Sequence, residues 1–523
     1  MNIFENAEFI SCEDNNRLFS VMIENKGKII FTGNTVPETY KMANRINLQN
    51  KCVVPAFGDT HIHFSSFSYF NAGLDCRYAN DFNDLGEIIN QHICNHKTGK
   101  VLLCFGCSAH TVKEKRLPER LDLDKITSHP IMIVKYDGHA SVANSALIKK
   151  IPASITQDEG FDKKTGWFYH NAFFKVTNHI SKSVSPLDVF RNLSYGADAL
   201  AQKGIHLIHA AEGVGFPMDI DIDITRIAAS VLPLEFRIFF QTMNINKVLK
   251  RKLPRVGGCF KNGLDGCLGS MDAALTAPYS NDIDNFGVLF YSQDEVNQFM
   301  KQANRAGLQI AVHAIGDAAI EQAIHGYEAA LSDFPREDHR HIIIHADLMT
   351  EKCIEKAAKL GIHIALQTPF LHWREEPMTY INDILGERSR QLIPLKSMSE
   401  AGIIAANGSD APCTHPDPLF GIYCACNHPN SDESISVIDA LRMHTNHAAK
   451  LSFDEETRGT LTEGKFADFV VLDQNPLKIP VEQFKNVKIE DLYMKGEKYK
   501  SLVESPYQLF LRAAYAMFTF FAR

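Results

Sequence analysis

The stretch VVPAFGDTHIH, residues 53–63, decides how the rest of this chain is interpreted. Its apolar beginning is typical of a buried strand, and two histidines, His61 and His63, follow that strand two positions apart. In an extended chain, side chains at positions i and i+2 point to the same face, so both imidazoles can reach one metal ion at about 2.0–2.1 Å. The alternative is a pair of polar residues in a loop, and the choice depends on whether later strands also end in metal ligands.

The composition is that of an ordinary globular protein. The chain has 523 residues, of which 45% are hydrophobic and 22% charged, and this length predicts one large domain plus a smaller one. A formal net charge of −8 gives no electrostatic footprint for nucleic acid, and no apolar run is long enough to span a membrane. Residues 1–15 lack the features of a secretory signal, so we expect a cytoplasmic protein whose 12 cysteines are reduced.

Strand-like runs alternate with helical patterns through the middle of the chain, as is typical of βα repeats. After the first strand, further strand-like runs occupy residues 205–211, 234–240, 256–261, 308–314, 341–346, 362–368 and 403–406. Together with the first, they predict an α/β fold with a (β/α)₈ barrel of the TIM type. The long segment 64–190 interrupts the repeat after strand one, and we expect it to form an insertion over the active site.

Short β-like runs at both ends of the chain are expected to combine into one composite β-sandwich. This organisation predicts a first sandwich part at residues 1–52, the barrel at 53–445 and a second sandwich part at 446–503. The remaining tail, 504–523, is apolar and rich in aromatic residues. We expect it to pack against the barrel wall or a neighbouring subunit, which leaves a homodimer open, rather than against a membrane.

In such a barrel, the active site lies at the carboxyl ends of the strands, so the residues at these ends are the decisive test. Strand one leads into the two histidines already named. Ligand-competent residues at later strand ends are Lys261, His313, His345 and Asp410. Imidazole and carboxylate groups suit a borderline divalent ion such as zinc, with iron and manganese as alternatives.

Lys261 needs a separate explanation, because an ammonium group has no lone pair to offer a metal. A lysine amine that carries CO₂ becomes a carbamate, whose two oxygens can bridge two cations. Its formation requires the neutral amine, and therefore a pKa lowered from about 10.4 by burial and nearby cations. The alternative is a salt-bridged lysine that binds substrate or Asp410.

Several motifs together resemble the amidohydrolase superfamily, and within it the branch typified by N-substituted formamide deformylase (amidohydrolase family 3). The matching motifs are PAFGDTHIH (55–63), KNGLDGCLGS (261–270), VHAIGD (312–317), IHA (344–346), GSDAP (408–412) and GKFADFVVL (464–472). The resemblance spans nearly the whole chain. It implies a binuclear metal centre in which a carbamylated Lys261 bridges two ions. One ion would be held by His61, His63 and Asp410, and the other by His313 and His345.

The chain also departs from the pattern of this family. The family often has Phe-Ala-Asp-Gly after the lysine position, where this chain has NGLDG at 262–266. An arginine commonly follows the Leu-Gly-Ser segment, where this chain has Met271. The resemblance therefore implies the metal ligands but leaves the substrate preference open.

We expect an amidohydrolase that cleaves a carbon–nitrogen bond, other than a peptide bond, in a small amide-type substrate. Two divalent ions, zinc by preference, would activate a water molecule, and Asp410 would carry its proton to the leaving nitrogen. His139, in the insertion, is a candidate for a hydrogen bond to the substrate oxygen. Trp373 and His372, in the loop after strand seven, are candidates for the substrate pocket.

Two other functions are compatible with the same barrel. A mononuclear deaminase would not need Lys261 and would use a carboxylic acid such as Glu212, after strand two. A binding protein that has lost catalysis would show damaged ligands, whereas all six ligand positions are intact. Metal analysis separates the three functions, since they predict about two ions per chain, one, or none.

Overall fold

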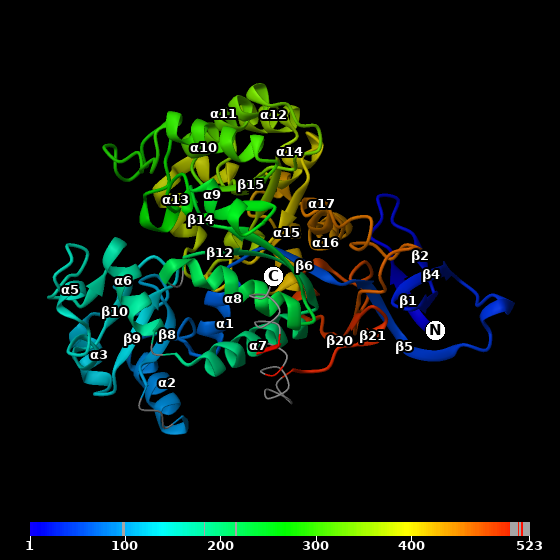
Figure 1. The fold of residues 1–523 in the computed structure, drawn as a ribbon, viewed down its shortest axis with the longest axis horizontal. Coiled ribbons are helices and arrows are strands. Elements are labelled where there is room, and N and C mark those ends of the chain that lie inside the picture. The colour runs from blue at the N-terminus through cyan, green and yellow to red at the C-terminus, as the bar shows by residue number, and fades with distance from the viewer. Residues whose placement is uncertain (97–99, 183, 215–216, 503–510, 512–513, 516–523) are drawn as a thin grey trace.

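The computed structural model describes residues 1–523 except 97–99, 183, 215–216, 503–510, 512–513 and 516–523 (Figure 1). The expectation for the tail at 504–523 therefore falls almost entirely outside the described residues. The described chain forms three sheets, which are a terminal sheet, a sheet of the insertion and a barrel.

Eight parallel strands form the barrel at the centre of the molecule. In order around the sheet they are β6 (Phe57–Ile62), β12 (Ile205–Glu212), β13 (Glu235–Phe240), β14 (Arg255–Gly263), β15 (Gln309–Ala314), β16 (Ile342–His345), β17 (His363–Leu366) and β18 (Ala405–Asn407). A parallel bridge between Ile62 and Ala411 joins the first strand to the segment after the last one. The α/β barrel that the sequence predicts is therefore confirmed.

The first barrel strand begins later than the sequence suggested. Residues 53–55 end a long strand, β5 (Asn44–Pro55), which pairs with β1 (Asn2–Ile10) and β19 (Phe469–Leu472) of the terminal sheet. Successive side chains of a strand face opposite sides. Accordingly, Val54 packs into the core of the barrel, whereas Val53 packs into a separate core of the terminal sheet. One apolar run thus contributes to two cores, which is why it reads as a single buried strand.

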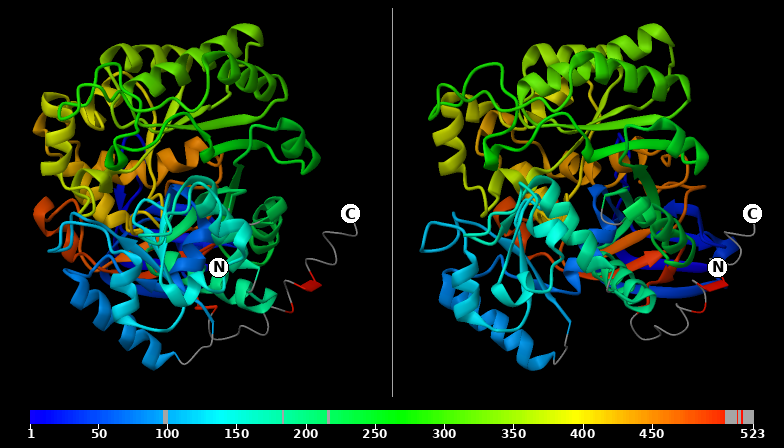
Figure 2. Two further views of the ribbon diagram at one scale, coloured as in Figure 1. Left: turned by 90° about the vertical axis from the view of Figure 1, so that its left-hand side faces the viewer. Right: turned by 60° about the vertical axis from the view of Figure 1, so that its left-hand side comes forward.

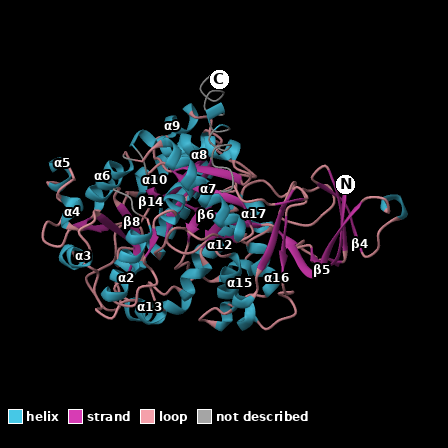
Figure 3. Cartoon of the chain, turned by 90° about the horizontal axis from the view of Figure 1, so that it is seen from below, coloured by secondary structure: helices cyan, strands magenta, loops and turns pink. Residues whose placement is uncertain are grey.

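The terminal sheet combines strands from both ends of the chain. Its order is β21 (Glu497–Lys498), β20 (Ile489–Met494), β19, β5, β1, β3 (Val21–Asn25) and β4 (Lys28–Gly33), with β2 (Leu18–Phe19) paired to β1. In Figures 1 and 3 this sheet extends to one side of the barrel. The two ends of the chain meet in it where β19 pairs with β5. A cluster of aromatic rings lies in its core, where Phe469 stacks on Tyr493 at 4.6 Å and meets Phe4 edge-on at 4.9 Å.

The insertion after β6 has its own sheet and its own hydrophobic cores. The strands of this sheet are β7 (Leu74–Asp75), β8 (Leu102–Cys107), β9 (Ile131–Lys135), β10 (Ser141–Ala143) and β11 (Trp167–Phe168). Figure 2 shows the insertion on one side of the barrel mouth, opposite the helices that follow β14 and β15. Loops from the insertion and from the barrel can therefore contribute to one site.

Helices connect these strands. They are α1 (Phe64–Asn71), α2 (Phe82–Asn95), α3 (Arg120–Ile126), α4 (Ser145–Ile148), α5 (Ala153–Thr156), α6 (His170–Ser181), α7 (Pro186–Gln202), α8 (Ile220–Val231), α9 (Ile245–Lys250), α10 (Gln293–Arg305), α11 (Asp317–Asp333), α12 (Glu351–Leu360), α13 (Met378–Leu385), α14 (Leu395–Glu400), α15 (Pro418–Cys426), α16 (Val437–Met443) and α17 (Asn446–Leu451). Among the described helices, none has both the length and the apolar character needed to cross a bilayer.

Replacing Phe469 by alanine should destabilise the terminal sheet, because the ring is fully buried between Phe4 and Tyr493. Truncation of a buried phenylalanine costs about 3–5 kcal/mol. We expect a lower midpoint in thermal or urea denaturation. The matched control, Phe286→Ala, removes a ring that is 48% exposed and should change stability by less than about 0.5 kcal/mol. Equal midpoints for the two variants would contradict this packing.

Candidate metal centre

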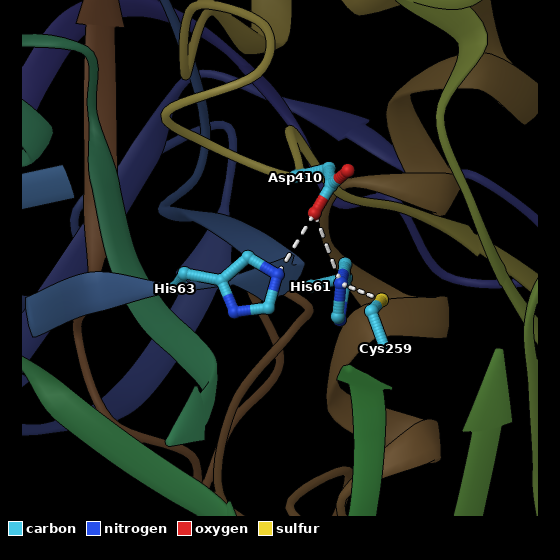
Figure 4. Close-up of side chains that lie close together, drawn as sticks. All are labelled: His61, His63, Cys259 and Asp410. Atoms are coloured by element: carbon cyan, nitrogen blue, oxygen red, sulfur yellow. Dashed lines mark hydrogen bonds and ion pairs between the residues drawn. The ribbon is translucent and has the colours of Figure 1, made fainter. Parts of the chain in front are cut away.

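His61 and His63 meet the carboxylate of Asp410 at the carboxyl end of the barrel. Asp410 Oδ1 lies 3.1 Å from His61 Nε2 and 3.2 Å from His63 Nε2. Figure 4 shows the carboxylate reaching toward both imidazoles, with the sulfur of Cys259 beside His61. Although burial opposes it, hydrogen bonds from the two histidines hold the pKa of Asp410 well below its usual range. The three groups that the sequence assigned to one ion therefore lie together.

Asp59 holds the backbone next to these three residues in position. Its Oδ1 accepts hydrogen bonds from the backbone N–H groups of His61 (3.2 Å) and Ser409 (2.9 Å), and its Oδ2 accepts one from the Ser409 hydroxyl (2.6 Å). The Asp410 N–H donates to the carbonyl of His61 at 2.8 Å. The aspartate of the GDTHIH motif thus holds the first and last strand ends together.

His313 and His345 stand at the ends of the neighbouring strands β15 and β16. Their rings lie edge-to-face with centroids 4.6 Å apart, and the ring of His345 lies 5.5 Å from that of His61. His345 (φ 72°) and Asp410 (φ 54°) both adopt the left-handed backbone region, which is uncommon for residues other than glycine. Such conformations persist where the surrounding structure enforces them, and they often mark functional sites.

Cys259, on β14, lies between the two histidine pairs. Its sulfur is 2.9 Å from His61 Nε2 and 3.3 Å from His345 Nε2. The side-chain oxygen of Gln241 accepts hydrogen bonds from the backbone N–H groups of Cys259 and Phe260, each at 3.0 Å, and so positions this part of the strand. We missed Cys259 in the sequence, where its position before Lys261 was the only available signal.

Lys261 lies outside this cluster, contrary to the expectation of a bridging carbamate. Its side chain is 43% exposed, and its ammonium group donates to the carbonyl of Gly213 (2.6 Å) and to Asp219 Oδ1 (2.8 Å). The reason lies in the strand register. β14 pairs with β15 at Gly258 and then only at Gly263, so the residues between form a bulge. The bulge directs Cys259, rather than Lys261, to the cluster.

The hydrogen bonds of the imidazoles fit metal ligation. His63 Nδ1 donates to the carbonyl of Ala211 (3.1 Å), and His345 Nδ1 donates to Gln367 Oε1 (2.5 Å). Ligating histidines characteristically donate their second ring N–H in this way, which leaves the other nitrogen free for the metal. His313 donates through Nε2 to the carbonyl of Gly266 (3.0 Å), and its buried Nδ1 has no hydrogen-bond partner.

The described residues thus form two ligand groups that share one sulfur. The first consists of His61, His63, Cys259 and Asp410, and the second of Cys259, His313 and His345; within each group the potential ligand atoms lie within 4.8 Å of one another. Burial lowers the pKa values of His61 and His345, which favours the neutral imidazoles that bind metals. At His63 and His313 burial acts in the same direction, but Asp410 and Asp265, respectively, outweigh it and raise the pKa. Imidazole, thiolate and carboxylate together suit zinc and related divalent ions.

A third group, Asp137, His139 and Cys267, is less suited to a metal. Lys135 Nζ lies 2.6 Å from Asp137 Oδ2, so the carboxylate already has a cationic partner. Burial lowers the pKa of His139, whose ring lies edge-on to Phe260 with centroids 5.2 Å apart. This histidine comes from the insertion and borders the same cavity as the metal-ligand cluster.

That cavity has a volume of about 60 Å³, and its lining includes Trp373. The indole of Trp373 stacks on Phe370 at 4.7 Å and meets Tyr136 of the insertion edge-on at 5.3 Å. His372, the other residue that we expected in the pocket, is exposed outside the cavity lining. Its Nε2 lies 2.8 Å from the carbonyl of Asn427. His372 ends a short helical turn, Thr368–His372, and Trp373 follows it in an extended conformation.

A (β/α)₈ barrel with imidazole, thiol and carboxylate groups gathered at its strand ends defines a metal-dependent barrel enzyme. The sequence profile described as "Amidohydrolase family" matches residues 45–498, and the chain belongs to this family. YtcJ of Bacillus subtilis (strain 168), whose name assigns it to the amidohydrolases, is 26% identical over 493 residues, covering 88% of this chain and 90% of YtcJ.

Two further comparisons agree. N-substituted formamide deformylase of Arthrobacter pascens is 22% identical over 497 residues, which cover 87% of this chain and 89% of that protein. Among solved structures, an uncharacterized metal-dependent hydrolase from Pyrococcus furiosus superposes with a TM-score of 0.74 at 22% identity, covering 91% of this chain and 100% of the other.

Substitutions of Cys259 and of Lys261 should have different effects on metal binding. Loss of a group that only supports a ligand costs about 10–100-fold in metal affinity, so loss of a shared ligand should cost at least about 100-fold. We expect Cys259→Ser to lose metal on dialysis, measured by atomic emission. Lys261→Met, which loses the ion pair with Asp219 and the hydrogen bond to Gly213 but no contact with the cluster, should keep the wild-type metal content. The reverse pattern would restore Lys261 as the ligand and remove Cys259.

Proposed function

We propose that this protein is a binuclear metal-dependent hydrolase that cleaves an amide-type carbon–nitrogen bond, other than a peptide bond, in a small molecule. The observation that carries the proposal is the pair of ligand groups that share Cys259, which lines the cavity. The family membership supports hydrolysis, and the name of the A. pascens relative supports an amide-type bond.

Two divalent ions, zinc by preference, would occupy the two groups. The first would be held by His61, His63 and Asp410, the second by His313 and His345, with Cys259 shared between them. Bound ions of this kind supply Lewis acidity and a water molecule whose pKa is lowered to about 7. Without a cation, burial raises the pKa of the Cys259 thiol well above its usual range, so metal binding and loss of this proton are coupled.

Asp410 is positioned to move a proton during the reaction. Its carboxylate borders the cavity, and a bound cation would favour its ionised form, which can accept a proton from the attacking water. The same carboxyl would then protonate the leaving nitrogen. Its backbone is held by the hydrogen bond to His61, so the group does not have to reorganise between the two transfers.

His139 and Trp373 would orient the substrate. Burial keeps His139 neutral, so its ring can donate one hydrogen bond to the scissile carbonyl oxygen, where negative charge develops in the transition state. The indole of Trp373 and the ring of Phe370 form an aromatic wall for an apolar part of the substrate. The insertion therefore completes a site whose metal ligands all come from the barrel.

The structure weighs against a mononuclear deaminase that relies on Glu212. The two carboxylate oxygens of Glu212 accept hydrogen bonds from the backbone N–H and the hydroxyl of Ser65, and the side chain does not border the cavity. Burial, together with Asp221, raises the pKa of Glu212 to about 8. Glu212 thus anchors the start of α1 rather than facing a substrate.

The cysteines support a reducing compartment for this reaction. All 12 are free thiols, and a thiol ligand such as Cys259 would be lost to disulfide formation under oxidising conditions. We therefore place the enzyme in the cytoplasm.

Asp410→Asn tests the proton transfer. With metal content checked, kcat on a panel of small N-acyl amines should fall by at least about 100-fold, because general acid–base groups typically contribute 10²–10⁴. Asp417→Asn, in the same loop but outside the main cavity, is the control and should retain activity. Hydrolysis by the Asp410 variant at the wild-type rate would exclude the proposed shuttle.

A further inference from the structure

A second polar group borders the cavity and has no role in the mechanism above. Glu376 lies in the loop between Trp373 and α13 and is 7% exposed. Its Oε1 is buried and has no hydrogen-bond partner. Its charged neighbours are Asp137 and Lys135 of the insertion and Asp347 after β16, not the metal-ligating histidines. The carboxyl does have one side-chain partner, the Tyr136 hydroxyl. A buried oxygen that keeps no partner is costly, which suggests that a ligand satisfies Oε1.

The surroundings of Glu376 are built to accommodate this carboxyl. A Cβ atom on Gly269 would lie 2.0 Å from Glu376 Oε1 and 2.4 Å from the Tyr136 hydroxyl, so a larger residue there would displace these two groups from their present positions. Tyr136 also meets Trp373 edge-on, which links the polar group to the aromatic wall of the cavity. Glu376, Gly269 and Tyr136 come from three separate segments, two in the barrel and one in the insertion.

The charges around this part of the cavity favour a hydrogen-bond donor over an anion. Lys135, the nearby cation, is already paired with Asp137 at 2.6 Å and bonds Ser270 at 3.1 Å. The described lining of the cavity includes no arginine or lysine. It does include a second buried carboxylate oxygen without a partner, Asp347 Oδ1. Beside Glu376, a substrate carboxylate would thus meet unpaired acceptors and a lysine that is already paired.

We propose that Glu376 is a specificity-determining residue that binds an N–H donor on the substrate, so that the enzyme prefers substrates with an amine or carboxamide there to those with a carboxylate. This inference rests on the proposed function where it calls the ligand a substrate, but ligand binding by Glu376 does not depend on that function. Burial, reinforced by Asp137, raises the pKa of Glu376 to about 8. The neutral acid can pair with a carboxamide by donating one hydrogen bond and accepting another, and a substrate ammonium group would favour the ionised form.

Binding can be measured separately from turnover by the fluorescence of Trp373 in the metal-loaded protein. The chain has only two tryptophans, and the other, Trp167, lies in the insertion, where its indole N–H donates to the carbonyl of Pro118. Suitable probes are benzamide, benzylamine and benzoate, which share one ring and differ in the polar group. They should be titrated into wild type, Glu376→Met and Glu376→Gln. Glu375→Met is the matched control, because Glu375 is equally buried but does not border the cavity.

We expect Glu376→Met to weaken benzamide and benzylamine about tenfold and to leave benzoate unchanged or tighter. Glu376→Gln should keep benzamide within about threefold, since its carbonyl accepts the same hydrogen bond, and this result also excludes misfolding as the cause. Glu375→Met should resemble wild type for all three probes. Unchanged affinity for benzamide and benzylamine in Glu376→Met, or an equal loss for benzoate, would overturn the proposal.

The two proposals fail in different ways. If the affinities depend on Glu376 while the metal-loaded wild type hydrolyses no member of the amide panel, the proposed function is wrong and the binding role of Glu376 stands. If amides are hydrolysed and the probe affinities do not depend on Glu376, the specificity role is wrong and the proposed function stands.

Discussion

Closure of the barrel is the constraint on which the site depends. Asp410 follows β18 and His61 ends β6, yet the N–H of Asp410 donates to the carbonyl of His61, and Asp59 ties both segments together. A ring of parallel strands must return to its starting point, and this return brings the carboxylate to the histidine pair. The cluster therefore follows from the closure of the barrel, with its ligands delivered by separate strands.

The central position of the cluster is occupied by a sulfur atom because of a local irregularity. Between Gly258 and Gly263, the bulged residues of β14 do not pair with β15. The N–H groups of Cys259 and Phe260 instead donate to the side-chain oxygen of Gln241. Bulges commonly redirect a side chain next to an active site. A thiolate is a ligand in its own right, whereas lysine would first have to lose a proton and bind CO₂. The ion pair with Asp219 instead holds Lys261 at the surface.

Much of this architecture could be predicted from the sequence, and the exceptions have physical causes. The barrel strands were predicted by their apolar runs, and the histidines and Asp410 by their positions at strand ends. Alternation along β5 could not reveal that Val53 and Val54 serve different cores. Cys259 and Lys261 are two positions apart, and a regular strand would place both on one face, so only the register of β14 distinguishes them. No sequence pattern indicated a binding role for Glu376, because its burial depends on the insertion.

The most direct test of the shared sulfur is a crystal structure of the metal-replete protein with anomalous scattering recorded at the zinc edge. Our account predicts two anomalous peaks, both within bonding distance of Cys259 Sγ, about 2.3 Å. One peak should be coordinated by His61, His63 and Asp410, and the other by His313 and His345. Peaks bridged by a modified Lys261, or no metal beside the sulfur of Cys259, would contradict it.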